Sequence, residues 1–124
     1  MIRAKMEYLS KPGMETSIKI KGNQILLNNL LVGTIDLNVY TADIVVVESF
    51  QLCHAYKRQG IGTAVINLLK REYTTITGCS SPLAVEFWKK VGAEFEYPVE
   101  AEHIEGLLEM GEYPPFIIKI ERKR

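Results

Sequence analysis

The chain has 124 residues, enough for one domain that buries roughly two-thirds of its unfolded surface without disulfides or metals. Its 15 Lys and Arg residues balance 15 Asp and Glu residues, which excludes a net field that would attract nucleic acid or an anionic membrane. Cys53 and Cys79 lack CxxC spacing, the two histidines lack metal-ligand spacing, and no apolar run approaches the ~18 residues of a membrane helix. We therefore expect a single domain over residues 1–124 that is reduced and cytoplasmic, holds no metal, and has no nucleic-acid or membrane partner.

The first half of the chain is predicted to form strands joined by tight turns. Alternating apolar and polar residues, with turn residues between them, predict strands over residues 1–9, 17–21, 24–27, 30–40 and 44–52. Gly22-Asn23 and Asn28-Asn29 suit two of these turns. The run from Ile44 to Val47, which continues through Phe50 and Leu52, is β-branched and almost continuously apolar. Such a run is typical of a central strand that is covered on both faces.

Helices and strands alternate in the second half. Apolar residues at offsets 0, 3, 4, 7 and 8 from Ile61 predict a helix that ends near Tyr73 and buries one face: Ile61, Ala64, Val65, Leu68 and Leu69. We expect the remaining elements to be a strand over 74–79, a helix over 81–92 capped by Ser81, a strand over 94–99, a helix over 100–110 and a strand over 116–120.

The junction between the central strand and the first helix carries the clearest functional signal, Lys57-Arg58-Gln59-Gly60-Ile61-Gly62. Gly60 and Gly62 lack a Cβ, so the amides of the first helical turn can approach a ligand closely. Those amides have no helical acceptors and lie at the positive end of the helix dipole, which favours a phosphate or diphosphate. Lys57 and Arg58 add positive charge, and Thr63 offers a hydroxyl group. The alternative is a tight turn that binds nothing.

Three phosphate-binding designs compete for these residues. A Walker loop ends in Gly-Lys-Ser/Thr, but this segment ends Gly62-Thr63-Ala64. A dinucleotide fingerprint needs a third glycine where Val65 stands. Residues 57–62 instead resemble the coenzyme A loop of the GNAT superfamily of acyl-CoA N-acyltransferases, Arg/Gln-x-x-Gly-x-Gly/Ala, with Lys57 as a conservative departure.

A second block, residues 81–93, resembles the other GNAT signature, Asn-x-x-Ala-x-x-hydrophobic-Tyr-x-x-hydrophobic-Gly-Phe. Ser81, Trp88 and Ala93 depart from it. The resemblance covers about residues 43–97 and implies an α/β (α+β) fold, a mixed, mostly antiparallel sheet of about six to seven strands flanked by about three helices. The usual plan has two helices after the first strand that wall the acceptor site. Because residues 1–40 are predicted to be strands, we expect a small, N-terminally trimmed member whose acceptor side is open.

The resemblance implies that an amine attacks acetyl-CoA, the co-substrate, directly, while backbone groups of Phe50 to Leu52 hold the pantetheine arm. The amide near Leu52 would face the acyl oxygen and stabilise its developing charge. The amine must lose a proton, and Glu48 is the first candidate for the base because a charge inside a central strand is costly to bury. The alternative is a strand bulge that sends Glu48 to solvent. His54 and Glu94 are weaker candidates.

Trp88 and Cys53 each have two alternative roles. Trp88 stands where relatives carry the tyrosine that protonates the departing thiolate, a step that an indole cannot perform. It could pack on the pantetheine or be a core aromatic, and Tyr97 or Tyr73 could replace the tyrosine only if the fold brings them to the sulphur. Cys53 could accept the acyl group, although a small buried thiol is the commoner role.

The expected function is therefore an acetyl-CoA-dependent N-acetyltransferase. Its acceptor would be a primary amine of a small molecule or of a peptide or protein end, and a second subunit could complete the open side as a homodimer. The alternative is a non-catalytic acyl-CoA-binding or protein-interaction module that kept the loop and lost the acid.

Overall fold

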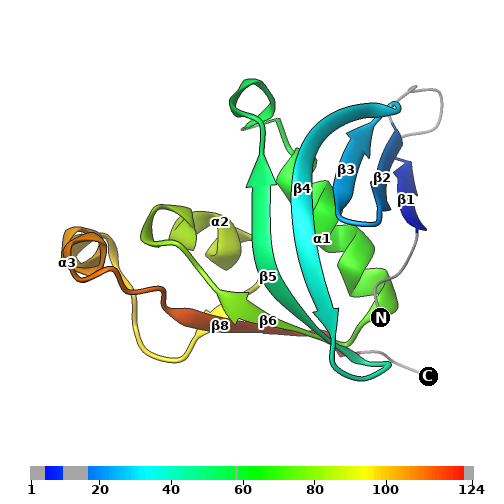
Figure 1. Cartoon of the computed structure of the whole chain (residues 1–124). Helices are drawn as coiled ribbons and strands as arrows, with labels where there is room; N and C mark the ends of the chain where they lie inside the picture. Colours follow the sequence, from blue (N-terminus) through cyan, green and yellow to red (C-terminus); the bar gives the residue numbers. More distant parts are fainter. Residues whose placement is uncertain (1–4, 10–16, 58, 122–124) are drawn as a thin grey trace.

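The computed structural model describes residues 5–9, 17–57 and 59–121 (Figure 1). The described strands form one sheet, in the order β1-β2-β3-β4-β5-β6-β8-β7, in which only β5 and β6 run parallel. The strands are β1 (Lys5–Leu9), β2 (Ser17–Lys21), β3 (Gln24–Leu27), β4 (Leu30–Val39), β5 (Ile44–Leu52), β6 (Thr75–Cys79), β7 (Glu94–Phe95) and β8 (Pro115–Lys119). The helices are α1 (Ile61–Glu72), α2 (Val85–Lys90) and α3 (Ile104–Met110), with short 3-10 turns η1 (His54–Tyr56), η2 (Pro82–Ala84) and η3 (Ala101–His103). The mixed, mostly antiparallel α+β fold is confirmed, with eight described strands against the six to seven expected.

Two-residue turns join the N-terminal strands, as predicted. Lys21 pairs with Gln24 across Gly22-Asn23, and Leu27 pairs with Leu30 across Asn28-Asn29. Asn28 and Asn29 have φ values of 50° and 70°. Two consecutive positive φ angles match the right-handed twist of the flanking strands, and asparagine adopts them more readily than most residues. The described residues before α1 contain no α-helix, as the sequence led us to expect.

The core lies between the sheet and α1. All five residues of the predicted helical stripe are buried: Ile61, Ala64, Val65, Leu68 and Leu69. They form one hydrophobic cluster with inward-facing residues of β2 to β6, such as Ile20, Ile35 and Val45. Figure 1 shows α1 lying behind β4. None of the described helices is long and apolar enough to cross a membrane.

Two local predictions are wrong in detail. The strand expected over 94–99 ends at Phe95, because β7 pairs only with Ile117 and Phe116 of β8 before the chain leaves the sheet. Ser81 makes no side-chain cap, and its carbonyl oxygen instead accepts a hydrogen bond from the Ser80 hydroxyl at 2.6 Å. The helix expected there consists of η2 followed by α2, and the one expected over 100–110 consists of η3 followed by α3.

Trp88 of α2 should be a large contributor to stability. Its side chain is 5% exposed, stacks on Phe116 with ring centroids 4.1 Å apart, and meets Phe87 edge-on at 5.1 Å. We expect Trp88→Ala to lower the free energy of unfolding by about 3–5 kcal/mol, because truncation removes aromatic contacts and leaves a cavity. Trp88→Phe should cost clearly less. Urea unfolding followed by circular dichroism measures both, and equal small losses would contradict the core role.

Candidate functional site at the β5–α1 junction

Strand β5 separates from β6 halfway along its length. The parallel pairing runs from Ile44 with Thr75 to Val47 with Gly78, whereas β4 stays paired with β5 as far as Leu52. Residues 48–52 of β5 therefore face β4 on one edge and no paired strand among the described residues on the other. Figure 1 shows the two strands diverging from their common start. A Cβ on Gly78 would lie 2.8 Å from the Val47 carbonyl oxygen, so the last parallel pair requires glycine.

A β-bulge lies at the point of separation. Asp36 pairs with Ser49 and Leu37 with Val47, so Glu48 is the extra residue of β5. The Asn38 side-chain amide donates to Glu48 Oε2 at 3.4 Å, and the Ser49 hydroxyl donates to Asp36 Oδ2 at 2.7 Å. The bulge that was the alternative interpretation of Glu48 is therefore present, and the carboxylate lies on an exposed face of the sheet.

This face carries three polar residues that the sequence did not single out: Asp36, Asn38 and Ser49. The alternation of Asp36 and Asn38 with Ile35 and Leu37 predicts that the two β4 residues lie on the wet face, and both are exposed there. The pairing of Asp36 with Ser49 across the strands depends on the one-residue register shift at the bulge. No local sequence pattern predicts that shift.

Backbone groups of β5 point into the gap between the strands. The Cys53 amide donates to the Val32 carbonyl oxygen of the β4 segment at 2.8 Å. Because successive residues of an extended chain direct their amides to opposite edges, the Leu52 amide is directed away from β4. Leu52 and Phe50 are half-buried and pack against the main core, and the Phe50 ring lies 5.9 Å from that of Phe87.

The loop after β5 leads directly into α1. Gln59 Nε2 donates to the Ala55 carbonyl oxygen at 2.9 Å, which holds the loop against η1, and Lys57 is exposed. Gly60 precedes α1 with φ 81° and ψ 0°, a left-handed conformation that favours glycine. Arg58, a predicted ligand of the cofactor, lies outside the described residues.

The N-terminus of α1 presents amides with no side-chain cap. The Ala64 amide donates to the Gly60 carbonyl oxygen at 3.1 Å, which begins the helical hydrogen-bond pattern, so the amides of residues 61–63 precede it. Gly60 has no side chain that could cap them, and no atom lies within 4 Å of the position of its absent Cβ. Thr63 is half-buried in the first turn. Ile61 is 4% exposed, so only its backbone is available to a ligand.

Gly62 has a packing role that the motif alone does not indicate. A Cβ at this position would lie 2.9 Å from Cε1 of Phe87 and 3.7 Å from Cζ of Phe50. The close approach of α1 to α2 therefore needs glycine here. Trp88 lies beside the same rings, with its centroid 6.1 Å from that of Phe50, and its burial fits the core role weighed above.

The weaker candidates are spread across the fold. Glu94 lies on β7, separated from β5 by β6 and β8, and Tyr73 follows the far end of α1, which is about 18 Å long for its 12 residues. His54 is exposed in η1. Cys53 and Cys79 are both exposed and free, so the expectation of a buried Cys53 thiol is wrong. Among the described residues, no group of His, Cys, Asp and Glu side chains could hold a metal ion.

Comparison with protein-family models finds no match, and comparison with curated protein sequences finds no significant one. Solved structures do match. A Bacillus anthracis protein assigned as a streptothricin acetyltransferase, in complex with acetyl coenzyme A, has a TM-score of 0.59 and 17% identity over 92% of this chain and 66% of its own. N-acetylglutamate synthase from Neisseria gonorrhoeae, complexed with coenzyme A and N-acetyl-glutamate, has a TM-score of 0.54 and 13% identity over 94% of this chain and 30% of its own.

A third match has nearly the same size as this chain. A GNAT family acetyltransferase from Elizabethkingia anophelis with acetyl-CoA bound has a TM-score of 0.55 and 12% identity over 94% of this chain and 97% of its own. The chain spans less than two-thirds of the Bacillus and Neisseria proteins. These likenesses show that the chain has the GNAT fold.

Gly62 offers a direct test of the packing at the junction. We expect Gly62→Ala to lower the free energy of unfolding by about 1–3 kcal/mol, because the added methyl group forces the Phe87 ring to move. In a Phe87→Leu background the same substitution should cost less, since the clashing atom is gone. Chemical denaturation of the four proteins measures this coupling. An equal cost in both backgrounds would show that the Phe87 ring is not the constraint.

Proposed function

We propose that this chain is an N-acetyltransferase that moves an acetyl group from acetyl-CoA to a primary amine. The observation that carries the proposal is the proximity in sequence and space of two features on a GNAT fold. One is the unpaired edge of β5 at residues 48–52, and the other is the uncapped N-terminus of α1 behind Gly60. Backbone donors of both kinds thus lie beside an open glycine, where a ligand could accept hydrogen bonds from them.

The residues fit coenzyme A at its diphosphate. The amides of Ile61, Gly62 and Thr63, with the Thr63 hydroxyl group, are the proposed diphosphate ligands, and open space at Gly60 admits the group. Lys57 and Arg58 would add charge, and Gln59 would hold the loop through its bond to Ala55. Backbone groups of Phe50 and Leu52 would hold the pantetheine arm. Trp88 would contribute indirectly, because its ring packs against the Phe50 ring and supports it.

Two groups of this chain would carry the chemistry. When bound, acetyl-CoA supplies a thioester carbonyl that an amine can attack. The Leu52 amide would donate to the acyl oxygen as negative charge develops on it. Glu48 would remove the proton of an alkylammonium group, whose ordinary pKa is ~10.4. The Asn38 side-chain amide would orient the Glu48 carboxylate. A thiol pKa of ~8.5 lets the thiolate leave near neutral pH without an acid at the Trp88 position.

The acceptor is proposed to be cationic before it reacts. Glu48 and Asp36 place two carboxylates on the exposed face of the bulge, and a partly hydrated negative site attracts ammonium groups. The proposed acceptor is the amine of a small molecule or of a peptide or protein end. A second subunit that completes this face, as a homodimer, is a further proposal.

The second candidate is a non-catalytic acyl-CoA-binding or protein-interaction module. The observation that favours it is the burial of Trp88, at 5% exposed, in the position where the GNAT signature has a tyrosine. The two candidates share the coenzyme A site and differ in turnover.

Coenzyme A binding tests the part that both candidates share. We expect calorimetry to detect binding of coenzyme A to the parent protein. Gly60→Asp should weaken it by at least about tenfold, because a carboxylate would cap the α1 amides and repel the diphosphate. Gly60→Asn is the matched neutral control, tolerates the same backbone conformation, and should lose much less. Equal affinities of the two variants would contradict the proposed diphosphate site.

Turnover tests the proposed base. Thiol release over a panel of primary amines should show acetyl transfer, and Glu48→Gln should lower kcat/KM at pH 7 by about 10²–10⁴-fold. Activity of that variant should recover as pH rises, because the neutral fraction of the amine rises without the base. Glu121→Gln, an exposed control, should behave as the parent. An unchanged pH profile in Glu48→Gln would remove Glu48 from the mechanism, and coenzyme A binding without turnover on any amine would favour the binding module.

A further inference from the structure

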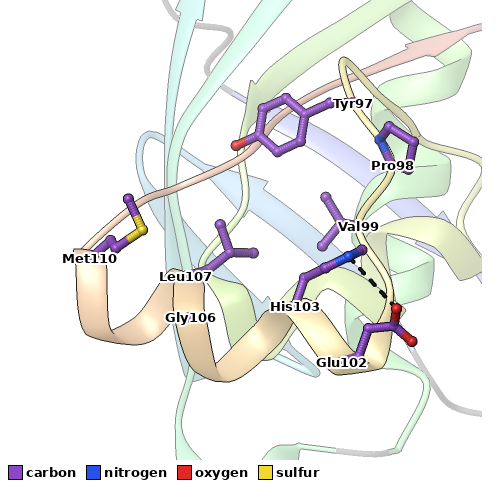
Figure 2. Close-up of a pocket in the computed structure, with 8 residues that line it drawn as sticks. All are labelled: Tyr97, Pro98, Val99, Glu102, His103, Gly106, Leu107 and Met110. Atoms are coloured by element: carbon purple, nitrogen blue, oxygen red, sulfur yellow. Dashed lines mark ion pairs between the residues drawn. The ribbon is translucent and has the colours of Figure 1, made fainter.

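A hollow of about 390 Å³ lies between α3 and the extended segment 97–99 (Figure 2). The lining residues of η3 and α3 are spaced three and four apart, so they share one helical face: His103, Gly106, Leu107 and Met110. Val99 and Leu107 are 2% and 8% exposed and belong to a small second core with Val85. Gly106 has no side chain, and no atom lies within 4 Å of the position of its absent Cβ. The hollow is therefore an apolar groove that a missing side chain at Gly106 keeps open.

Apolar side chains remain exposed around the mouth of this groove. Met110 is 71% exposed and Tyr97 39%, and Figure 2 shows both at its edge. Leu108 and Tyr113, which are close to these residues in the sequence but do not line the groove, are 48% and 60% exposed. Half of the large exposed hydrophobic residues described for the protein thus lie within residues 97–113. Clustered exposed apolar residues of this kind mark interaction surfaces more often than isolated ones do.

The segment of the chain that forms the groove is strongly acidic. Residues 94–112 hold seven of the 15 acidic residues and none of the 15 Lys and Arg residues: Glu94, Glu96, Glu100, Glu102, Glu105, Glu109 and Glu112. The neighbouring cation is Lys89, whose Nζ lies 3.7 Å from Glu100 and 3.8 Å from Glu86 and donates to the Val99 carbonyl oxygen at 2.6 Å. Glu102 lies 3.9 Å from the imidazole of His103. Glu105 and Glu109 are exposed on α3.

We propose that this groove binds a basic peptide segment of a partner protein. A leucine or phenylalanine of the segment would enter the hollow above Gly106, and flanking Lys or Arg residues would lie near Glu102 and Glu109. The negative charge of residues 94–112 excludes nucleic acids and acidic proteins as partners. It also disfavours a symmetric contact between two copies of α3, which would bring the exposed Glu105 and Glu109 of one copy close to those of the other. The site is distinct from the proposed acetyl-transfer site, since α3 packs on η2 and shares a small second core with Val85, the first residue of α2.

The test uses a fluorescein-labelled 12-residue peptide of alternating lysine and leucine, with anisotropy measured on the full chain without coenzyme A. Gly106→Leu fills the hollow and should weaken binding at least tenfold. Gly106→Ala is the matched control: like Gly106→Leu it raises helix propensity, but it does not fill the hollow, so its affinity should stay within twofold of the parent. Neither variant strains the backbone, because an added Cβ at this helical position meets no atom.

Charge is tested with a second pair of variants. Combined Glu102→Gln and Glu109→Gln should weaken binding by about tenfold and reduce its dependence on salt, whereas Glu121→Gln should leave both unchanged. A peptide in which serine replaces each lysine should bind at least tenfold more weakly. The proposal is overturned if the lysine–leucine peptide does not bind at millimolar concentration, if Gly106→Leu binds it as the parent does, or if the serine peptide binds equally well.

Discussion

The separation of β5 from β6 is the constraint on which the rest of the structure depends. Four parallel pairs join the strands, and the last of them is possible only because Gly78 lets its backbone approach the Val47 carbonyl oxygen. The next residue, Glu48, is the bulge that turns β5 toward β4. Aromatic rings then occupy the space beneath the divergence, with Trp88 stacked on Phe116. The backbone donors left on the open edge of β5 are the reason that we propose this place as the site for an acyl carrier.

The two glycines of the loop beside this separation, Gly60 and Gly62, have different roles. Gly60 supplies a left-handed turn with open space in front of the α1 amides, which is the role that phosphate-binding motifs give to glycine. Gly62 instead lets α1 approach Phe87. The loop is therefore fixed by aromatic packing at Gly62 and open to solvent at Gly60. This arrangement holds the uncapped amides of α1 in position for an anion.

Sequence periodicity predicted most of the elements but little of the detail in the site. The stripe of α1 and the paired asparagines at residues 28–29 are local signals, and both were confirmed. The register shift at Glu48 was only one of two open alternatives, because a bulge depends on a partner strand ten residues away. The roles of Asp36 and Ser49 follow from that shift. The groove beside Gly106 was not predicted, since it depends on how α3 packs over Val99.

The most direct test of the central claim is a titration of the ¹⁵N-labelled protein with coenzyme A, observed through its amide resonances. We expect the largest shift changes at Gly60 to Thr63 and at Leu52, with small changes across α3. Saturation at millimolar ligand without changes at these amides, or with changes confined to another surface, would contradict the claim that the divergent edge of β5 and the N-terminus of α1 form one binding site.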